Sequence, residues 1–219
     1  MDKNEQAAAS IKSGDMEEAF KLLNEAIEEN PEDPVPYINF GNLLADINES
    51  EKALNFYQKA LQLDNQAAAA YYGAGNVLYN AEKFAEALTM YQQALKAGMD
   101  DESLHYMMGI TYYQSGRIPH ALASLQRALE MNENDTEARF YFGLALAQLE
   151  RVEEAIPHFL QVTAEDEQHA DAYYNLGVAY MYKEDAAKAL SYFEEALHIQ
   201  PDHLLAHNGK ERAQEMLEK

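Results

Sequence analysis

The sequence predicts an all-α fold, a solenoid of antiparallel helix pairs, because three series of small residues share one period of 34 residues. One series is alanine, the second is glycine, and the third is alanine with a single valine. A fixed period of this length indicates helix-pair repeats that stack on one another. The three series are Ala19, Ala53, Ala87, Ala121, Ala155 and Ala189; Gly41, Gly75, Gly109, Gly143 and Gly177; and Ala26, Ala60, Ala94, Ala128, Val162 and Ala196.

The segment 34–67 shows how one period is built. Apolar or small residues recur at helical spacing from Tyr37 to Leu44 and again from Ala53 to Leu63. Each unit is therefore predicted to contain a first helix, a short turn and a second helix, with about 12 to 15 residues in each helix. The predicted turns are Gly14-Asp15, Asn48-Glu49, Glu82-Lys83, Gly116-Arg117, Glu150-Arg151 and Glu184-Asp185.

The six predicted units lie at 1–33, 34–67, 68–101, 102–135, 136–169 and 170–203, and a C-terminal capping helix occupies 204–219. We expect one continuous solenoid domain over 1–203, since each unit buries its apolar face against its neighbours. The opening helix is expected from about Asp2 to Lys12, and the capping helix from Leu204 to Leu217. Pro157 is expected near the start of a second helix, where a missing N–H costs little.

The glycine series predicts close contact between paired helices. Glycine in a helix interior costs roughly 1 kcal/mol relative to alanine, so the contact must compensate. Gly41 is expected to face Ala53 and Ala60 on the second helix, with Leu44 and Tyr57 interdigitating around them. A large side chain, as in Gly109→Leu, is expected to force the helices apart.

The last full unit carries the most distinctive pattern. Its first helix reads Ala172-Tyr-Tyr-Asn-Leu-Gly-Val-Ala-Tyr180, its second reads Ala189-Leu-Ser-Tyr-Phe-Glu-Glu-Ala-Leu197, and Pro201 follows. With this pattern and period, nearly the whole chain resembles the tetratricopeptide repeat (TPR) family. The resemblance implies a right-handed superhelix whose first helices line a concave face, which family members commonly use to hold peptides or helices of partner proteins.

Two departures from the family pattern affect these expectations. The proline that ends the second helix in the family is kept at Pro31 and Pro201, and its loss elsewhere is expected to loosen the junctions slightly. The substituted positions are Asn65, Met99, Glu133 and Glu167. The clamp with which some members grip a C-terminal carboxylate is absent, because the matching basic positions hold Ile38, Tyr72, Ser103 and Met107.

The composition excludes several classes of function. There are 38 acidic and 16 basic residues, for a net charge of −22, whereas nucleic acids and anionic membranes require clustered Lys and Arg. We therefore expect neither as a partner; the acidity serves either solubility or the steering of a basic partner. Cysteine is absent, so disulfides and thiolate metal sites are excluded. The residues from Met1 to Gln6 lack the apolar region of a signal peptide, and no apolar stretch approaches the roughly 18 residues of a membrane helix. A cytoplasmic location is therefore expected.

Residues of the first helices that point away from the paired helix are predicted to line the concave face. They are mainly Asn and Tyr in the N-terminal half and mainly apolar farther along. Asn can donate to and accept from a peptide backbone, and aromatic or Met side chains can anchor apolar groups. Routine helix packing is the alternative for both kinds of residue. The predicted peptide-binding residues are Asn39, Asn42, Tyr72, Asn76, Tyr79, Asn80, Tyr106, Met107, Ile110, Tyr113, Phe140, Tyr141, Leu144, Tyr174, Asn175, Val178 and Tyr182.

No catalytic residue, metal site or cofactor is predicted, and we expect no enzymatic activity. His203 and His207 are four residues apart, a spacing that can hold a metal, but solvent-exposed histidines are the favoured interpretation. No glycine-rich phosphate loop is present, and the carboxylates are too numerous for any two to be singled out as acid and base.

The predicted function is that of a protein–protein interaction adaptor or scaffold that binds a peptide segment or helix of a partner in the concave groove. An apolar segment with Lys or Arg is expected, because Asp46, Glu137 and Asp171 near the groove repel a free carboxylate. Two alternatives stay open. One is a self-associating structural scaffold that docks another copy through the apolar groove or through Leu204 and Leu205, and the other is a regulatory subunit of an enzyme. Joint replacement of Tyr106, Phe140 and Tyr141 by alanine is expected to abolish capture of the partner.

Overall fold

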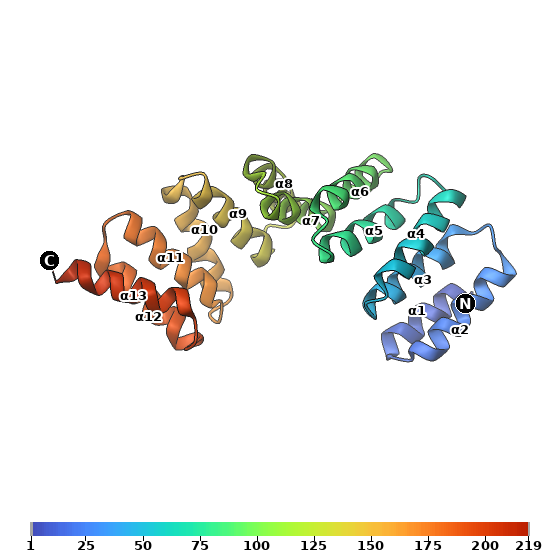
Figure 1. Ribbon diagram of the computed structural model, residues 1–219, viewed down its shortest axis with the longest axis horizontal. Helices are drawn as coiled ribbons and strands as arrows, with labels where there is room; N and C mark the ends of the chain where they lie inside the picture. The colour runs from blue at the N-terminus through green and yellow to red at the C-terminus, as the bar shows by residue number, and fades with distance from the viewer. Residues whose placement is uncertain (1, 219) are drawn as a thin grey trace. The chain divides into compact units, whose positions relative to one another are not determined.

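The computed structural model describes residues 2–218, and within them the chain consists of α-helices joined by short turns, without strands (Figure 1). The predicted all-α fold of antiparallel helix pairs is confirmed. The helices are α1 (Lys3–Ser13), α2 (Met16–Glu29), α3 (Pro34–Asp46), α4 (Ser50–Leu63), α5 (Ala68–Asn80), α6 (Phe84–Lys96), α7 (Glu102–Gln114), α8 (Ile118–Met131), α9 (Thr136–Gln148), α10 (Val152–Glu165), α11 (Ala170–Tyr182), α12 (Ala186–Ile199) and α13 (Leu204–Leu217).

The chain divides into two compact units, one up to Thr111 and one from Tyr112 onward, so the division falls within α7. In the first unit α1 packs on α2, α3 on α4, and α5 on α6. In the second unit α9 packs on α10, α11 on α12, and α13 on α12. The continuity of one solenoid over 1–203 stays a prediction.

In each predicted 34-residue repeat, a residue with a left-handed backbone conformation follows the end of the first helix. The amide that follows it donates to a carbonyl five residues earlier, as from Arg151 to Leu146 at 3.0 Å, which is the Schellman ending of a helix. This geometry lies at each turn that the 34-residue period predicts. The φ angles are 82° at Gly14, 61° at Asn48, 57° at Glu82, 74° at Gly116, 61° at Glu150 and 59° at Glu184.

The periodic glycines make room for an aromatic ring of the second helix. A Cβ atom at Gly41 would lie 2.7 Å from the ring of Tyr57, and one at Gly75 would lie 2.5 Å from the ring of Tyr91. The predicted close approach is therefore present, and its nearest atoms belong to Tyr57, the residue expected to interdigitate around the contact, rather than to Ala53 or Ala60. Those two alanines are fully buried on either side of the ring along α4.

At the boundary between successive 34-residue repeats, a side chain at the fourth position of the first helix donates a hydrogen bond to the preceding loop. Tyr37 donates to the Pro31 carbonyl at 3.1 Å, and Tyr71 donates to the Asn65 carbonyl at 3.4 Å. In the fifth 34-residue repeat the guanidinium of Arg139 donates to the carbonyl of Glu133. The same junction is therefore closed whether or not proline stands at its carbonyl.

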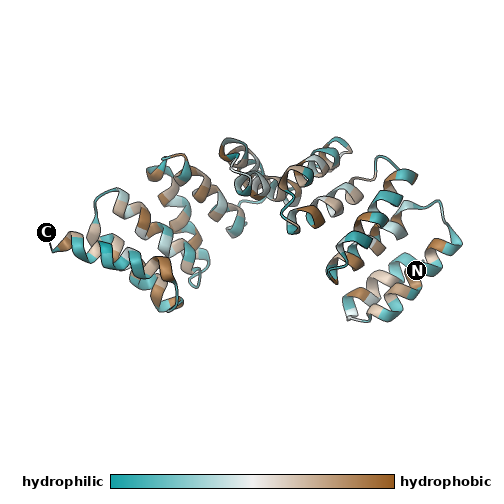
Figure 2. Cartoon of the chain, viewed as in Figure 1, coloured by the Kyte–Doolittle hydropathy of each residue, from teal (hydrophilic) through white to brown (hydrophobic). Residues whose placement is uncertain are grey.

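Two further features concern single helices. Pro157 is the sixth residue of α10, in the second turn and so close to the first turn as expected, and the helix continues to Glu165. Hydrophobic and hydrophilic residues alternate along most helices (Figure 2), as expected when one face of each helix is buried.

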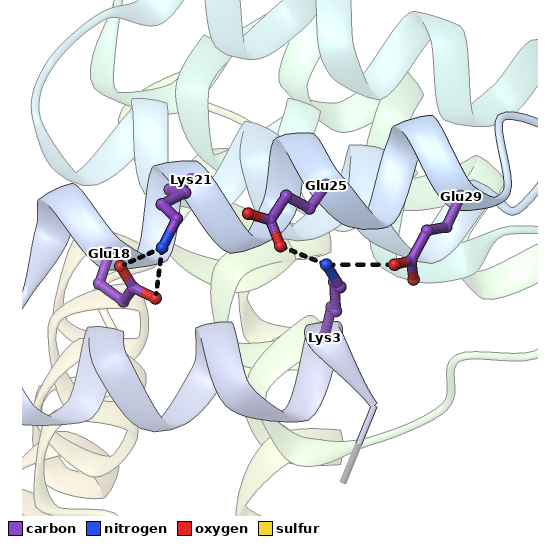
Figure 3. A network of polar contacts seen from close by, with 5 residues as sticks. All are labelled: Lys3, Glu18, Lys21, Glu25 and Glu29. Carbon is purple, nitrogen blue, oxygen red and sulfur yellow. Dashed lines mark hydrogen bonds and ion pairs between the residues drawn. The ribbon is translucent and has the colours of Figure 1, made fainter.

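An ion-pair network joins α1 to α2 (Figure 3). The Lys3 ammonium contacts Glu25 and also Glu29, the latter at 3.1 Å, and its hydrogen bond to Glu25 lowers the pKa of that carboxyl. Lys21 and Glu18 form a second pair at 3.1 Å on α2. These contacts supplement the small apolar surface of α1, whose buried residue is Ala7.

Candidate functional site: the first-helix face

The first helices form a layer of their own in each unit. Contacts run from α1 to α3 and from α3 to α5 in the first unit, and from α9 to α11 and from α11 to α13 in the second. Among residues 2–218, no second helix contacts the second helix of another repeat within a unit. We call the surface of this layer the first-helix face.

The first unit carries a polar hollow of about 430 Å³ between α3 and α5. Asn42 and Asn80 are exposed within it, and Asn76 is half-buried. The hollow is lined among others by Asn42, Asp46, Tyr57, Tyr72, Asn76 and Asn80. Three predicted asparagines and Tyr72 are thus brought together.

Tyrosines of the second helices fix the orientation of two of these asparagines. The Tyr57 hydroxyl donates to Asn42 Oδ1 at 2.7 Å, and the Tyr91 hydroxyl donates to Asn76 Oδ1 at 2.8 Å. Burial raises the pKa of both tyrosines well above the usual range, so each hydroxyl keeps its proton and serves as donor. With Oδ1 engaged, the Asn42 carboxamide has its NH2 group left for other acceptors, whereas the Asn76 side chain also hydrogen-bonds the Tyr72 hydroxyl.

The second unit carries two apolar hollows on its first-helix face. One of about 210 Å³ lies between α9 and α11 and is lined among others by Ala147, Glu150, Val152, Asn175, Val178 and Tyr182. The other, of about 290 Å³, lies between α11 and α13 and is lined among others by Tyr174, Val178, Met181, Leu205, Asn208 and Arg212. Val178 lines both hollows and is 42% exposed, and Tyr182 is 60% exposed.

The first-helix face is polar in the first unit and apolar in the second. The difference involves pairs of residues, with one member on each helix of a repeat. Where the first unit has Asn42 with Tyr57 and Asn76 with Tyr91, the second has Leu144 with Phe159 and Val178 with Phe193. A phenylalanine has no hydroxyl to donate, so an asparagine oxygen beside it would lose its partner. The two positions therefore change together.

Two predicted residues, Phe140 and Ile110, offer little surface. Phe140 is 8% exposed, and its ring centroid lies 4.4 Å from that of His169 and 6.0 Å from that of Phe159. Ile110 is 5% exposed. The alanine test at Phe140 would remove a core side chain, so it cannot separate loss of binding from loss of stability.

The remaining predicted residues are half-buried. Tyr113 packs edge-on against Tyr141 at 5.8 Å, and the Asn175 amide donates to the Asp171 carbonyl at 2.7 Å. Burial raises the pKa of Tyr113 and, together with Asp171, that of Tyr174. The half-buried residues not yet placed are Asn39, Tyr79, Tyr106, Met107, Tyr141 and Leu144.

Sequence reasoning missed several residues of the second unit as site residues: Glu150, Met181, Asn208 and Arg212. Arg212 stands 34 residues after Val178, so one more step along that series would have found it. Glu150 belongs to a turn, for which the sequence predicts a backbone conformation and no binding role.

The expectation of exposed histidines was wrong for His203. It is 7% exposed, its Nδ1 accepts the Ala206 amide at 3.1 Å, and its Nε2 contacts Asp171 at 3.1 Å. His203 therefore caps α13. Across residues 2–218 there is no group of three or more His, Cys, Asp or Glu placed to hold a metal ion, and no helix in the same range is long and apolar enough to span a membrane.

A further hollow, of about 580 Å³, lies away from the first-helix face, among α8, α9 and α10. Its charged lining includes Arg151, whose guanidinium holds Glu154 through two contacts of 2.7 Å. Burial and then the nearby Arg139 lower the pKa of His158 in this hollow.

Comparison with known proteins identifies the family. TPR family models match residues 4–33, 41–81, 75–116, 106–168 and 170–203. The crystal structure of YrrB, described as a TPR protein with an unusual peptide-binding site, is 53% identical with a TM-score of 0.80, covering 86% of this chain and 97% of that one. This chain belongs to the tetratricopeptide repeat family.

Other matches share either a short stretch of sequence or the fold with this TPR chain. The TPR repeat-containing protein YrrB of Bacillus subtilis (strain 168) is 54% identical over 41 residues, which span 19% of this chain and 20% of that protein. Pseudomonas aeruginosa pilF has a TM-score of 0.83 at 18% identity and covers 96% of both chains. MamA has a TM-score of 0.71 at 20% identity, covering 77% of this chain and 92% of that one. At such identities pilF and MamA show the fold alone.

Proposed function

We propose that this TPR protein is an adaptor or scaffold that binds a peptide segment or helix of a partner protein on its first-helix face. The observation that carries the proposal is the position of the polar hollow and both apolar hollows, each of which lies between successive first helices. The description of YrrB as having a peptide-binding site supports it.

The two units offer complementary kinds of contact. In the first unit the NH2 group of Asn42 suits a carbonyl oxygen of a peptide backbone, independent of its sequence. In the second unit Val178, Tyr182 and Leu205 suit apolar side chains. A basic partner is favoured by the net charge of −22, which attracts cations and raises the rate of encounter.

Affinity purification of the protein followed by mass spectrometry tests the proposal. Partners captured by the wild type should be lost from the Val178→Ser/Leu205→Ser variant, because two exposed apolar contacts become polar. The control is Leu160→Ser, which changes a leucine of α10 that is 39% exposed. Equal capture by the double variant, or loss with the control alone, would contradict binding on the first-helix face.

A self-associating scaffold is the second candidate, favoured by Leu204 and Leu205 on α13, which are 76% and 57% exposed. Exposed leucines at the end of a helix array can dock a second copy. Sedimentation velocity at several protein concentrations separates the two functions, since a monomer at every concentration eliminates self-association.

A further inference from the structure

Two charged residues flank the apolar part of the first-helix face in the second unit. Glu150 lines the hollow between α9 and α11, Arg212 lines the hollow between α11 and α13, and Val178 lines both. Both charged residues are exposed. In the described part of the chain, neither the Glu150 carboxylate nor the Arg212 guanidinium has a hydrogen bond or ion pair.

Two other charged residues of the same unit, Asp171 and Arg151, are engaged within the protein. Asp171 contacts His203 at 3.1 Å, and Arg151 holds Glu154 at 2.7 Å. Glu150 and Arg212 are therefore available to form ion pairs with an external partner. Because their charges are opposite, a partner with two opposite charges is favoured in one orientation.

The hollows are sized for side chains. Their volumes of about 210 and 290 Å³ lie below the roughly 300 to 1,000 Å³ of small-molecule sites. Each therefore suits one apolar side chain, held against Val178 and, at the far end, against Leu205.

We propose that this surface binds a peptide segment that carries two apolar side chains between opposite charges, with the basic residue toward Glu150 and the acidic residue toward Arg212. The inference rests on the proposed function and specifies its ligand. The reverse orientation would place like charges at both ends, which disfavours it. A second copy of the chain is disfavoured as occupant, because two chains of charge −22 repel each other.

Selection from a phage-displayed library of random dodecapeptides tests the inference. Peptides selected on the wild type should carry a basic residue on one side of an apolar pair and an acidic residue on the other. Selection on Glu150→Lys should replace the basic residue by an acidic one, and selection on Arg212→Glu should replace the acidic residue by a basic one. Glu150→Gln should weaken the wild-type peptides on the order of fivefold, as for an exposed ion pair.

Glu184 supplies the matched control. It occupies the same turn position one repeat later, with φ 59° against 61° at Glu150, and it is outside both hollows. Glu184→Lys should leave the selected peptides unchanged, and thermal melting should show all variants folded.

The outcomes separate this inference from the function on which it rests. Selected peptides that bind the first-helix face equally well in both charge variants would overturn the inference and leave the proposed function standing. Absence of any enriched peptide would overturn both. Concentration-dependent self-association that Val178→Ser abolishes would assign the surface to a second copy and overturn the peptide ligand.

Discussion

At the scale of single residues, the ring that lies against each periodic glycine determines how closely two helices pack. The Tyr57 ring lies against both Gly41 and Gly73, and the Phe193 ring lies against both Gly177 and Gly209. One aromatic side chain therefore packs against its own first helix and the next one. This explains why glycine persists where alanine is the better helix former.

Replacing Gly75 by alanine tests this packing. A Cβ atom there would lie 2.5, 2.7 and 3.0 Å from ring atoms of Tyr91, and overpacking of this kind costs about 1–3 kcal/mol. Urea denaturation should show that loss of unfolding free energy.

The added variant Gly75→Ala/Tyr91→Leu serves as the control, since Leu125 holds the position equivalent to Tyr91 one repeat later. It should be less destabilised than the sum of the two single changes, because the neighbours share one space. Strict additivity would show that the ring does not limit the approach.

Tyr91→Phe tests the hydrogen bond that orients Asn76. The change removes the donor to Asn76 Oδ1, a bond of 2.8 Å, and should lower the unfolding free energy by about 1 kcal/mol. Denaturant titration measures the loss. Phe159 already stands at the matching position beside Leu144, so the double variant Tyr91→Phe/Asn76→Leu should recover part of it. Unchanged stability in the single variant would argue against the bond.

At the scale of the helical element, the left-handed turn residues carry a cost that differs between repeats. Gly14 and Gly116 adopt positive φ without steric penalty. The same conformation carries a steric penalty at Glu82, Glu150 and Glu184. The 34-residue period predicts where these turns lie, and the local residue at each turn determines its cost. The glutamates are tolerated since the Schellman hydrogen bonds and the adjoining helices hold the turn.

Glu184→Gly should therefore stabilise the protein. Relief of the left-handed conformation, about 1–2 kcal/mol, exceeds the extra unfolded-state entropy of glycine, about 0.4–1 kcal/mol, so a net gain of about 0.5–1 kcal/mol is expected. The denaturation midpoint measures it. Glu184→Ala keeps a Cβ atom and should gain much less; equal gains from both variants would point to charge rather than backbone strain.

Sequence reasoning was less complete for side chains whose surroundings come from other repeats. Period and spacing identify Asn42, Asn76 and Val178 as residues of the first helices, and the structure places each in a hollow. The same reasoning does not reveal that Phe140 is buried against His169, because that contact joins α9 to the cap of α11. Nor does it single out Arg212, whose role depends on a hollow formed by two helices.

At the scale of the whole molecule, the net charge of −22 affects stability as well as partners. Charges of one sign repel within a compact chain, and salt screens that repulsion over a Debye length of about 30 Å at 0.01 M and about 10 Å at 0.1 M. The thermal midpoint should therefore rise with NaCl over this range. A midpoint that falls would show that attractive pairs such as Lys3 with Glu29 outweigh the repulsion.

The most direct test of the central claim is methyl NMR of the protein during titration with a peptide from the dodecapeptide selection. The account predicts that the methyl resonances of Val178 and Leu205 shift with saturation while those of Leu160, on the second helix α10, stay in place. Shifts at Leu160 with none at Val178 or Leu205 would contradict binding on the first-helix face.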